Sequence, residues 1–260
     1  MQLENGVAFI TGGASGIGLA LARIFAAERM HIVLADIDSA QLALAARGLP
    51  GEVLTVTMNV ADREHWAAAK KRVMETFGRV DVLCNNAGIG PDGQQLADMN
   101  PESFERIIAI NLTGVFNGIA TFADHMRQRG SGHILNTASM AGLNPIPTIG
   151  GYVAAKFGVV GLSEVLCQEL APSGVGVTVL CPGLVNTRLA ETTQAITQGA
   201  PLPSAANLSL SLGAISADQV ARVALQAIRE KRLYALTNPE YRDAVEARCR
   251  RLLESFDPLA

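Results

Sequence analysis

The chain has 260 residues, of which 49% are hydrophobic and 17% are charged, and its formal net charge is -3. This composition is typical of a globular protein with one large core and argues against a disordered chain. Because α/β folds often reach this length as one unit, we expect a single domain over residues 1–260. The small negative charge gives no electrostatic reason to expect nucleic acid or an anionic membrane as partner, so we expect small-molecule partners.

No motif in the sequence indicates a disulfide, a metal site or a membrane anchor. The cysteines are widely spaced without a C-x-x-C pair, and we expect buried free thiols at Cys84, Cys167, Cys181 and Cys249. The histidines lack the spacing of metal ligands, and we expect surface or strand-end positions for His31, His65, His125 and His133. No signal-peptide pattern opens the chain and no apolar run is long enough to cross a bilayer, so we expect a cytoplasmic protein.

Short apolar runs alternate along the chain with longer segments of helical periodicity. The runs predict strands buried on both faces, because their hydrophobicity is nearly continuous, at residues 7–11, 31–36, 53–60, 80–86, 132–139 and 175–182. The longer segments predict helices at residues 16–29, 61–78, 100–130 and 151–173. The third of these helices opens with Asn100 as cap and Pro101 in its first turn. This order predicts a doubly wound, Rossmann-type α/β fold with a parallel sheet, helices on both faces, and ligands at the carboxyl ends of the strands.

Residues 184–215 carry few charges and no sustained period, which predicts a substrate flap. We expect this flap to become ordered over bound substrate and to exclude water. An apolar pocket is predicted from Leu202, Leu208, Leu210, Leu212, Met140 and Leu143. Regular structure returns at Ser216, which has capping-box spacing to Gln219, and continues with a short strand and a terminal helix from Pro239.

A glycine-rich turn follows the first predicted strand and opens the first helix. Its glycines fall at Gly12, Gly16 and Gly18, a G-x-x-x-G-x-G spacing that differs from the common G-x-G-x-x-G. The spacing still permits a tight turn and a close approach of backbone to a pyrophosphate at the helix N-terminus. Such a turn can also be purely structural, but its position after the first strand favours a dinucleotide site.

Asp36 ends the second predicted strand, where a carboxylate can accept hydrogen bonds from both hydroxyls of an adenosine ribose. A 2'-phosphate at this place would be repelled. No arginine stands at Ile37 or in the glycine-rich turn at Ala14 and Ser15 to compensate the phosphate charge. The sequence therefore favours NAD over NADP, although an aspartate at a strand end can also serve only to form a turn.

Tyr152 and Lys156 are four residues apart, so on a helix their side chains share one face. A phenol with an ordinary pKa of about 10 is a poor base at neutral pH, and an adjacent ammonium favours the phenolate. We therefore expect Lys156 to lower the pKa of Tyr152 toward the working pH. The same spacing also occurs in amphipathic helices with a packed tyrosine and a surface lysine.

Taken together, these motifs make the chain resemble the short-chain dehydrogenase/reductase family over nearly all of its residues. TGGASGIG is similar to the family's cofactor loop, and NNAG at residues 85–88 is similar to its fourth-strand motif. Asn111 matches its helix asparagine, and Ser139 stands thirteen residues before Tyr152. CPGLVNT at residues 181–187 is similar to the segment beside the nicotinamide.

The resemblance implies a role for each of four catalytic residues. Tyr152 exchanges a proton with the substrate oxygen, and Ser139 holds that oxygen by a hydrogen bond. Lys156 perturbs Tyr152 and binds the nicotinamide ribose, while Asn111 holds a water that links Lys156 to solvent. It also implies a homodimer or homotetramer and an NAD site made by Gly12, Ser15, Gly16, Ile17, Gly18, Asp36, Asn59, Val60, Asn86, Tyr152, Lys156, Pro182, Gly183, Val185 and Thr187.

At one position the chain departs from the family's pattern. Many members carry an aspartate before the valine at the end of the third strand, whereas this chain has Asn59 before Val60. An amide oxygen can still accept from an adenine amino group, so we expect this contact to persist.

The sequence predicts an NAD-dependent oxidoreductase that interconverts a secondary alcohol and a ketone, with no metal. A first alternative is a ketoreductase acting on carrier-bound acyl groups, which usually implies NADP and a basic docking surface; Asp36 and the net charge argue against it. A second is a nucleotide-binding regulator without catalytic activity. The complete set of Asn111, Ser139, Tyr152 and Lys156 favours the enzyme.

Overall fold

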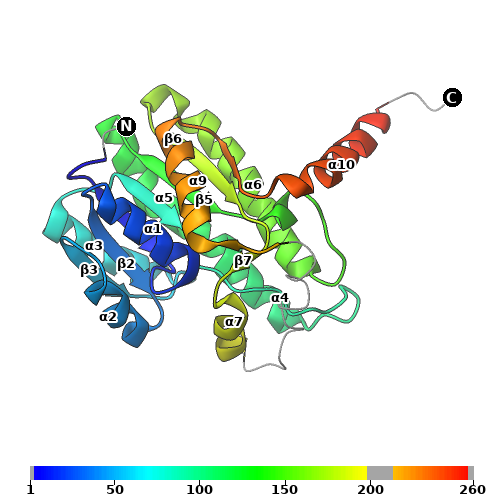
Figure 1. The fold of residues 1–260 in the computed structure, drawn as a ribbon, viewed down its shortest axis with the longest axis horizontal. Helices are drawn as coiled ribbons and strands as arrows, with labels where there is room; N and C mark the ends of the chain where they lie inside the picture. The colour runs from blue at the N-terminus through cyan, green and yellow to red at the C-terminus, as the bar shows by residue number, and fades with distance from the viewer. Residues whose placement is uncertain (1–2, 198–212, 257–260) are drawn as a thin grey trace.

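The protein is a single parallel sheet between two layers of helices, seen in a computed structural model that describes residues 3–197 and 213–256 (Figure 1). Seven strands lie in the order β3-β2-β1-β4-β5-β6-β9, and every pairing in that sheet is parallel. They are β1 Val7–Thr11, β2 His31–Asp36, β3 Val53–Thr57, β4 Val82–Asn85, β5 His133–Thr137, β6 Gly176–Cys181 and β9 Tyr234–Leu236. The predicted doubly wound, Rossmann-type fold is confirmed.

The central strands are buried on both faces, as their continuous hydrophobicity predicts. In β1, Phe9 packs into the core on one side of the sheet, whereas Ala8 and Ile10 pack into the core on the other. The Phe9 ring lies 5.7 Å from Trp66 and 5.2 Å from Phe122, measured between ring centroids. Because successive side chains of a strand point to opposite faces, this one strand contributes to both layers.

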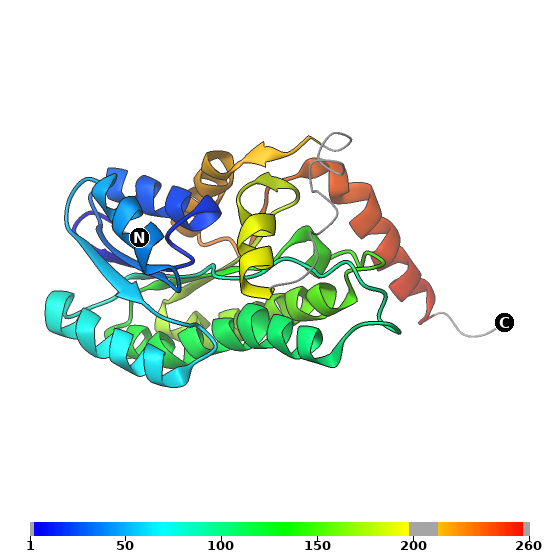
Figure 2. The same cartoon turned by 90° about the horizontal axis from the view of Figure 1, so that it is seen from below.

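The helices divide between the two faces, as Figure 2 shows with the sheet seen between them. One face is covered by α1 Gly16–Ala27, α2 Ser39–Arg47 and α9 Ala217–Arg229. The other is covered by α3 Arg63–Phe77, α5 Gly114–Arg129 and α6 Gly150–Leu170, and α4 Pro101–Ile108 packs against α6 through Ile107. The α10 helix Arg242–Glu254 follows a short turn at Pro239–Tyr241 and projects from the body (Figure 1).

The helix starts expected from the sequence are present. Asn100 caps α4 by accepting from the Glu102 backbone N–H at 2.8 Å, with Pro101 in the first turn. Ser216 and Gln219 form the expected capping box at the start of α9. Between α4 and α5 the helix widens into one π-helical turn, Ala109–Thr113, which the sequence did not indicate.

The predicted flap is more regular in its first part than its sequence suggested. Residues 184–197 and 213–215 contain β7 Val185–Asn186, the start of β8 Ile215–Ser216, which pairs with β7, and the helix α7 Leu189–Thr197. The expectation of no regular structure is therefore wrong for α7. The helix buries a threonine, Thr193, while its larger aliphatic residues Leu189 and Ile196 stay partly exposed, so its sequence shows no apolar period. Four leucines predicted to line the pocket lie outside the described residues: Leu202, Leu208, Leu210 and Leu212.

The expectation about the cysteines needs correction, whereas His133 has the expected strand-end position. Cys84 and Cys181 are buried as free thiols, but Cys167 is only partly buried and Cys249 on α10 is exposed. His133 begins β5 and is fully buried, where its Nε2 lies 2.8 Å from Thr178 Oγ1. No cluster of metal-ligand side chains occurs within residues 3–197 and 213–256.

Two helical segments are long and apolar enough to span a membrane by length and composition alone, contrary to our expectation that no run would be. They are Pro101–Arg129 and Gly150–Ser173. Both pack one face onto the sheet, with Phe122 and Val159 fully buried there. Their outer faces keep Phe116 and Val165 exposed.

Candidate active site

All four predicted catalytic residues come from segments that follow the carboxyl ends of β4 and β5. Ser139 lies two residues beyond β5, and Tyr152 and Lys156 lie on the first turns of α6. Asn111 lies in the π-helical turn between α4 and α5. The loops after parallel strands open at this edge of the sheet, which is where α/β folds of this type bind ligands.

Lys156 is almost fully buried, with 4% of its surface exposed, and its ammonium donates to the Thr137 backbone carbonyl at 3.0 Å. Its Nζ lies 5.4 Å from the centre of the Tyr152 ring. Burial disfavours the charged form and lowers the pKa of Lys156 to about 8. A buried lysine with one carbonyl partner is costly, which is typical of a residue retained for function.

The expected lowering of the Tyr152 pKa is wrong in this structure. Burial raises the pKa of the phenol, and interaction with the Ser139 hydroxyl opposes this only in part. The Lys156 ammonium lies over the ring and is engaged with Thr137, and it does not bring the pKa of Tyr152 below its usual value. Tyr152 is therefore a neutral phenol at neutral pH, suited to donate a proton.

Ser139 is held in place by the short 3₁₀ turn that follows it. Its Oγ accepts from the Ala141 backbone N–H at 3.1 Å, and it lies 3.4 Å from the Pro182 carbonyl as donor. The Met140 backbone N–H also donates to Pro182, at 2.8 Å. These bonds join the segment after β5 to the segment after β6 and fix the direction of the serine hydroxyl.

The Asn111 side chain is fully buried and pairs with Ile89 in both directions. Its Oδ1 accepts from the Ile89 N–H at 2.8 Å, and its Nδ2 donates to the Ile89 carbonyl at 2.9 Å. Gly88 fits between Asn111 and Lys156, since a Cβ there would lie 2.8 Å from Asn111 Oδ1 and 3.7 Å from Lys156 Nζ. One amide proton and one acceptor position of Asn111 remain for a water.

The glycine-rich turn has the geometry that a dinucleotide requires. Gly12 and Gly16 have φ values of +64° and +52°, in the left-handed region. A Cβ at Gly18 would lie 2.0 Å from the Gly12 carbonyl oxygen, so no side chain fits there. Ser15 precedes α1 in extended conformation without a side-chain cap, and Ile17 is partly buried in the first turn. The first N–H groups of α1 therefore face the turn, where an anion is favoured.

Asp36 lies beside the glycine-rich turn. Its Oδ2 accepts from the Ala14 backbone N–H at 3.1 Å, and its Oδ1 accepts from the Asp38 N–H at 3.2 Å. Each carboxylate oxygen keeps acceptor capacity after these bonds. The carboxylate thus occupies the position at the end of β2 where ribose hydroxyls can be bound.

Asn59 and Val60 form a rigid turn after β3. The Asn59 Oδ1 accepts from Ala61 N–H at 3.0 Å, so part of its acceptor capacity serves the turn itself. The Val60 carbonyl accepts from Trp66 Nε1 at 2.8 Å and from Asn117 Nδ2 at 3.0 Å. The turn is fixed from inside the protein, and its outer side is available to a ligand.

The remaining predicted cofactor residues line the same edge. The Asn86 backbone N–H and Nδ2 donate to the Thr11 hydroxyl and carbonyl, at 2.9 Å and 3.1 Å. A Cβ at Gly16 would lie 3.2 Å from the Thr187 side chain, which brings the glycine-rich turn next to the segment after β6. That segment is positioned by buried Pro182, by Gly183 and by the pairing of Val185 with Ile215.

Three groups of this site were not expected from the sequence. The Thr137 carbonyl, which binds Lys156, is a backbone atom and leaves no trace in residue types. Ile89, which pairs with Asn111, also acts through its backbone. Asn238 is buried and its Oδ1 accepts from the Gly183 N–H at 3.0 Å. In the sequence, the role of Asn238 was indicated only by its position as a polar residue directly before Pro239.

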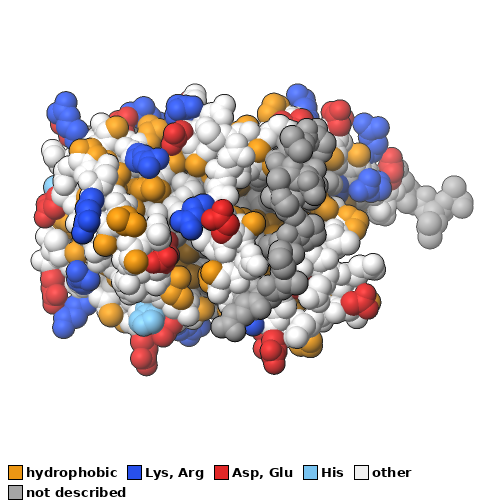
Figure 3. Space-filling model, turned by 60° about the horizontal axis from the view of Figure 1, so that its bottom comes forward, with side chains coloured by type: hydrophobic (Ala, Val, Ile, Leu, Met, Phe, Trp, Pro, Cys, Tyr) orange, Lys and Arg blue, Asp and Glu red, His pale blue; other side chains and the backbone are white. Residues whose placement is uncertain are grey.

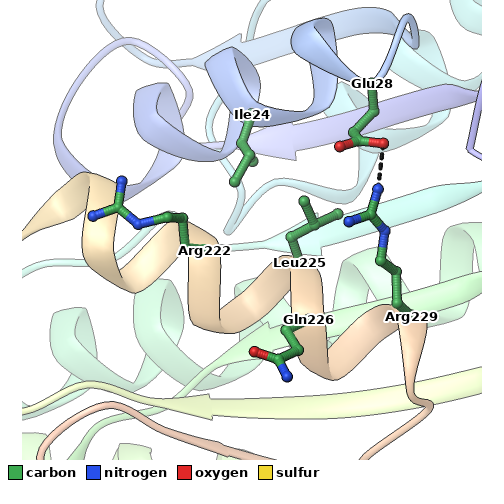
Figure 4. A pocket seen from close by; sticks show the side chains of 6 residues that line it. All are labelled: Ile24, Glu28, Arg222, Leu225, Gln226 and Arg229. Atoms are coloured by element: carbon green, nitrogen blue, oxygen red, sulfur yellow. Dashed lines mark hydrogen bonds and ion pairs between the residues drawn. The ribbon is translucent and has the colours of Figure 1, made fainter.

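A surface groove of about 550 Å³ lies away from this site. It runs between α1 and α9 and is lined by Ile24, Glu28, Arg222, Leu225, Gln226 and Arg229 (Figure 4). Arg229 is paired with Glu28 across the groove. Glu28 ends α1, whose start faces the glycine-rich turn, so the groove belongs to the opposite end of the helix.

The sequence matches the short chain dehydrogenase family over residues 6–197, which is most of the chain. The chain therefore belongs to the short-chain dehydrogenase/reductase family, a family of oxidoreductases. The resemblance drawn from its motifs is confirmed.

Three relatives illustrate the range within this family. The chain is 37% identical to the 3-oxoacyl-(acyl-carrier-protein) reductase FabG of Thermotoga maritima, over 74% of this chain and 78% of that protein. It is also 37% identical to a 3-alpha-(or 20-beta)-hydroxysteroid dehydrogenase of Mycobacterium tuberculosis, over 73% of each. A solved short chain dehydrogenase/reductase from Burkholderia phymatum in complex with NAD has a TM-score of 0.89 and 33% identity, covering 100% of this chain and 99% of that one.

Proposed function

We propose that the protein is an NAD-dependent oxidoreductase that interconverts an apolar secondary alcohol and the corresponding ketone. The observation that carries the proposal is the buried Lys156 ammonium over the Tyr152 ring, next to the fixed Ser139 hydroxyl. Nothing in the packing of the core requires a phenol, an ammonium and a hydroxyl to meet at this edge of the sheet.

In this proposal Tyr152 is the general acid and base. Its raised pKa keeps the phenol protonated at neutral pH, so in ketone reduction it donates a proton to the substrate oxygen. On substrate binding Ser139 turns its hydroxyl proton from the Pro182 carbonyl to the same oxygen, and holds that oxygen within reach of the phenol. In alcohol oxidation Tyr152 first releases its own proton toward Lys156 and solvent, and the resulting phenolate then accepts the proton of the substrate hydroxyl.

Lys156 and Asn111 support this proton transfer. Lys156 is placed to donate to the nicotinamide ribose and, when charged, to favour the phenolate of Tyr152. Asn111 fixes the backbone at Ile89 and keeps capacity for a water that leads protons toward Lys156. We assign these two residues as members of the catalytic set on that basis.

The residues at the edge of the sheet fit NAD as the cofactor, which supplies or accepts the hydride when bound. The left-handed turn at Gly12 and Gly16 at the start of α1 suits a pyrophosphate, and Asp36 is placed for the ribose hydroxyls. The similarity to the Burkholderia phymatum protein in complex with NAD supports the same choice. The further contacts that we propose come from Ser15, Ile17, Asn59, Val60, Asn86, Pro182, Gly183, Val185 and Thr187.

An apolar substrate is supported by side chains around the site rather than by the two residues after Ser139. Met140 is buried in the core and Leu143 packs against it, half-buried, so their expected place in the pocket wall stays a prediction. Exposed aliphatic side chains instead come from the loop after β4, the loop before α6 and α7, namely Leu96, Ile146, Leu189 and Ile196. The similarity to a hydroxysteroid dehydrogenase agrees with an apolar alcohol.

The experiment that tests this function is a panel of secondary alcohols and ketones, assayed by NADH absorbance at 340 nm. We expect turnover with NAD on apolar cyclic or long-chain alcohols and little on charged ones. Absence of turnover on every alcohol and ketone, with NADH still bound, would favour the regulator instead.

The similarity to a carrier-protein reductase supports one alternative, a ketoreductase for carrier-bound acyl groups. On the face drawn in Figure 3, positively and negatively charged side chains are interspersed, whereas an acidic carrier is best bound by a basic patch. The discriminating measurement compares an acyl group on its carrier with the same group as a small thioester. A catalytic efficiency at least a hundredfold higher on the carrier would establish the alternative.

A cytoplasmic location and assembly as a homodimer or homotetramer belong to the same proposal. The exposed apolar residues on the outer faces of α5 and α6 support the assembly.

A further inference from the structure

The helix α7 buries a polar side chain, that of Thr193. Thr193 is 2% exposed, and its Oγ1 accepts from the Gly90 backbone N–H at 2.7 Å. The same hydroxyl donates to the Leu189 carbonyl one turn earlier, at 2.6 Å. The hydroxyl proton of Thr193 is therefore engaged within α7, and one acceptor position of its oxygen is engaged with the loop after β4. In Figure 2 this helix, drawn in yellow, lies between the two helical layers.

The loop that Thr193 binds, residues 88–90, also contacts the proposed catalytic residues Asn111 and Lys156. Gly90 directly follows Ile89, which pairs with Asn111 through both backbone groups. Gly88 directly precedes Ile89 and lies against both Asn111 and Lys156. Gly88, Ile89 and Gly90 are consecutive, so this short segment lies beside Lys156 at Gly88 and is bonded to α7 at Gly90.

Thr193 also sets which side chains α7 turns toward the site. Leu189 and Ile196 lie four residues before and three residues after Thr193, so the three share one helix face. The Leu189 side chain comes within 3.8 Å of the Cβ position at Gly90. Fixing Thr193 on Gly90 therefore fixes the direction of both aliphatic side chains, of which Leu189 lies against the loop after β4.

We propose that Thr193 is a positioning residue, which holds α7 on Gly90 and so places Leu189 and Ile196 against the substrate and steadies residues 88–90 beside Lys156. The proposal rests on the function proposed above. It adds that substrate fit and the geometry of the catalytic loop depend on a single hydroxyl. Without that hydroxyl the buried Gly90 N–H loses its acceptor, the one that it has among residues 3–197 and 213–256, which is unfavourable.

The test uses Thr193→Val, which keeps the shape and removes the hydroxyl, and Thr193→Ser, which keeps the hydroxyl. The matched control is Thr192→Val, because among the described residues the Thr192 hydroxyl bonds to the Arg188 and Leu189 carbonyls at the start of α7 and not to the loop after β4. Amide hydrogen exchange at Gly90 is measured on the full chain. We expect exchange at least about tenfold faster in Thr193→Val, and exchange within twofold of the original protein in the other two variants.

The second readout is kinetic. Thr193→Val should raise the KM for the best secondary alcohol by about five- to tenfold, with Thr193→Ser restoring most of it. The proposal would be overturned if Thr193→Val showed normal exchange at Gly90 or a normal KM. It would also be overturned if Thr192→Val had an equal effect, or if Thr193→Ser did not restore exchange and KM. If no alcohol is turned over at all, the proposed function fails, while Gly90 exchange still decides whether Thr193 holds α7.

Discussion

The Lys156 ammonium lies over the face of the Tyr152 ring, 5.4 Å from its centre, and is bound to the Thr137 carbonyl behind it. The lysine is thus fixed to the sheet by its own hydrogen bond and does not depend on the phenol for its place. For this reason the two residues should respond differently to substitution.

Replacement of Tyr152 by Phe removes the phenol oxygen and leaves the ring. Because general acid and base catalysis typically contributes about 10²- to 10⁴-fold, turnover should fall by at least about 10²-fold. The NADH dissociation constant, measured by fluorescence titration, should stay within about twofold, since the ring and Lys156 remain. Near-normal turnover in Tyr152→Phe would mean that the tyrosine is only a packed aromatic residue.

Replacement of Lys156 by Met should stabilise the protein while damaging its function. The pKa of Lys156 falls from 10.5 to about 8 on folding, so the charged form is disfavoured in the folded state at pH 7. At about 1.4 kcal/mol per pKa unit, burying the charged Lys156 costs roughly 3 kcal/mol. The variant avoids this cost but loses the hydrogen bond to Thr137, which reduces its gain in stability by about 1 kcal/mol. We expect the free energy of unfolding from urea titration to rise by about 2 kcal/mol at pH 7.

The pH dependence of this gain follows from the direction of the pKa shift. Between pH 8 and 10.5 the unfolded chain binds a proton at Lys156 that the folded chain has lost, so the cost fades as the pH rises. The advantage of Lys156→Met should therefore shrink toward pH 10. NADH should bind the variant more weakly at every pH, and unchanged NADH affinity would remove the proposed contact with the ribose.

Asp36 should make NAD strongly preferred over NADP. Its carboxylate is held beside the glycine-rich turn by Ala14, so a 2'-phosphate would face an uncompensated negative charge. Asp36→Ala should lower the ratio of the catalytic efficiency with NAD to that with NADP, and adding Ile37→Arg should lower this ratio further. Comparable efficiency of the original protein with both cofactors would contradict this role.

His133 should make the protein sensitive to mild acid. Burial lowers its pKa from 6.5 to about 3, so below pH 6.5 the unfolded chain takes up a proton that the folded chain does not. Stability should fall as the pH drops from 6.5 toward 3, by roughly 2–3 kcal/mol at pH 4.5. His133→Gln keeps a donor for Thr178 and does not titrate. The free energy of unfolding, measured by urea titration, should therefore change less between pH 7 and 4.5 in this variant than in the original protein.

Assembly should depend on the exposed apolar faces of α5 and α6. Phe116 is 43% exposed and Val165 is 53% exposed, whereas isolated soluble helices usually turn polar residues outward. We expect a dimeric or tetrameric mass by light scattering at micromolar concentration, and a smaller mass for Phe116→Glu. A monomer at that concentration would contradict the proposed assembly.

The sequence predicted those features that depend on residue type and spacing. Strand hydrophobicity, the helix cap at Asn100 and the glycine-rich turn are local signals, and the structure confirms each of them. The direction of the Tyr152 pKa shift was wrong because it depends on burial and on where Lys156 points, which are tertiary properties. The pairing of Asn111 with Ile89 was missed because its partner is backbone. The α7 helix was missed because Thr193, a polar residue, occupies its buried face.

The strand order has a consequence for how the chain is made. Phe9 in β1 pairs with Val33 on one side and with Leu83 on the other, so the second edge of β1 stays unpaired until β4 has left the ribosome. An open, apolar strand edge is a template for pairing with other chains. Nascent or proteolysed chains that end before Val82 should therefore aggregate, and contacts so distant in sequence should make folding slow compared with that of helical proteins of similar size.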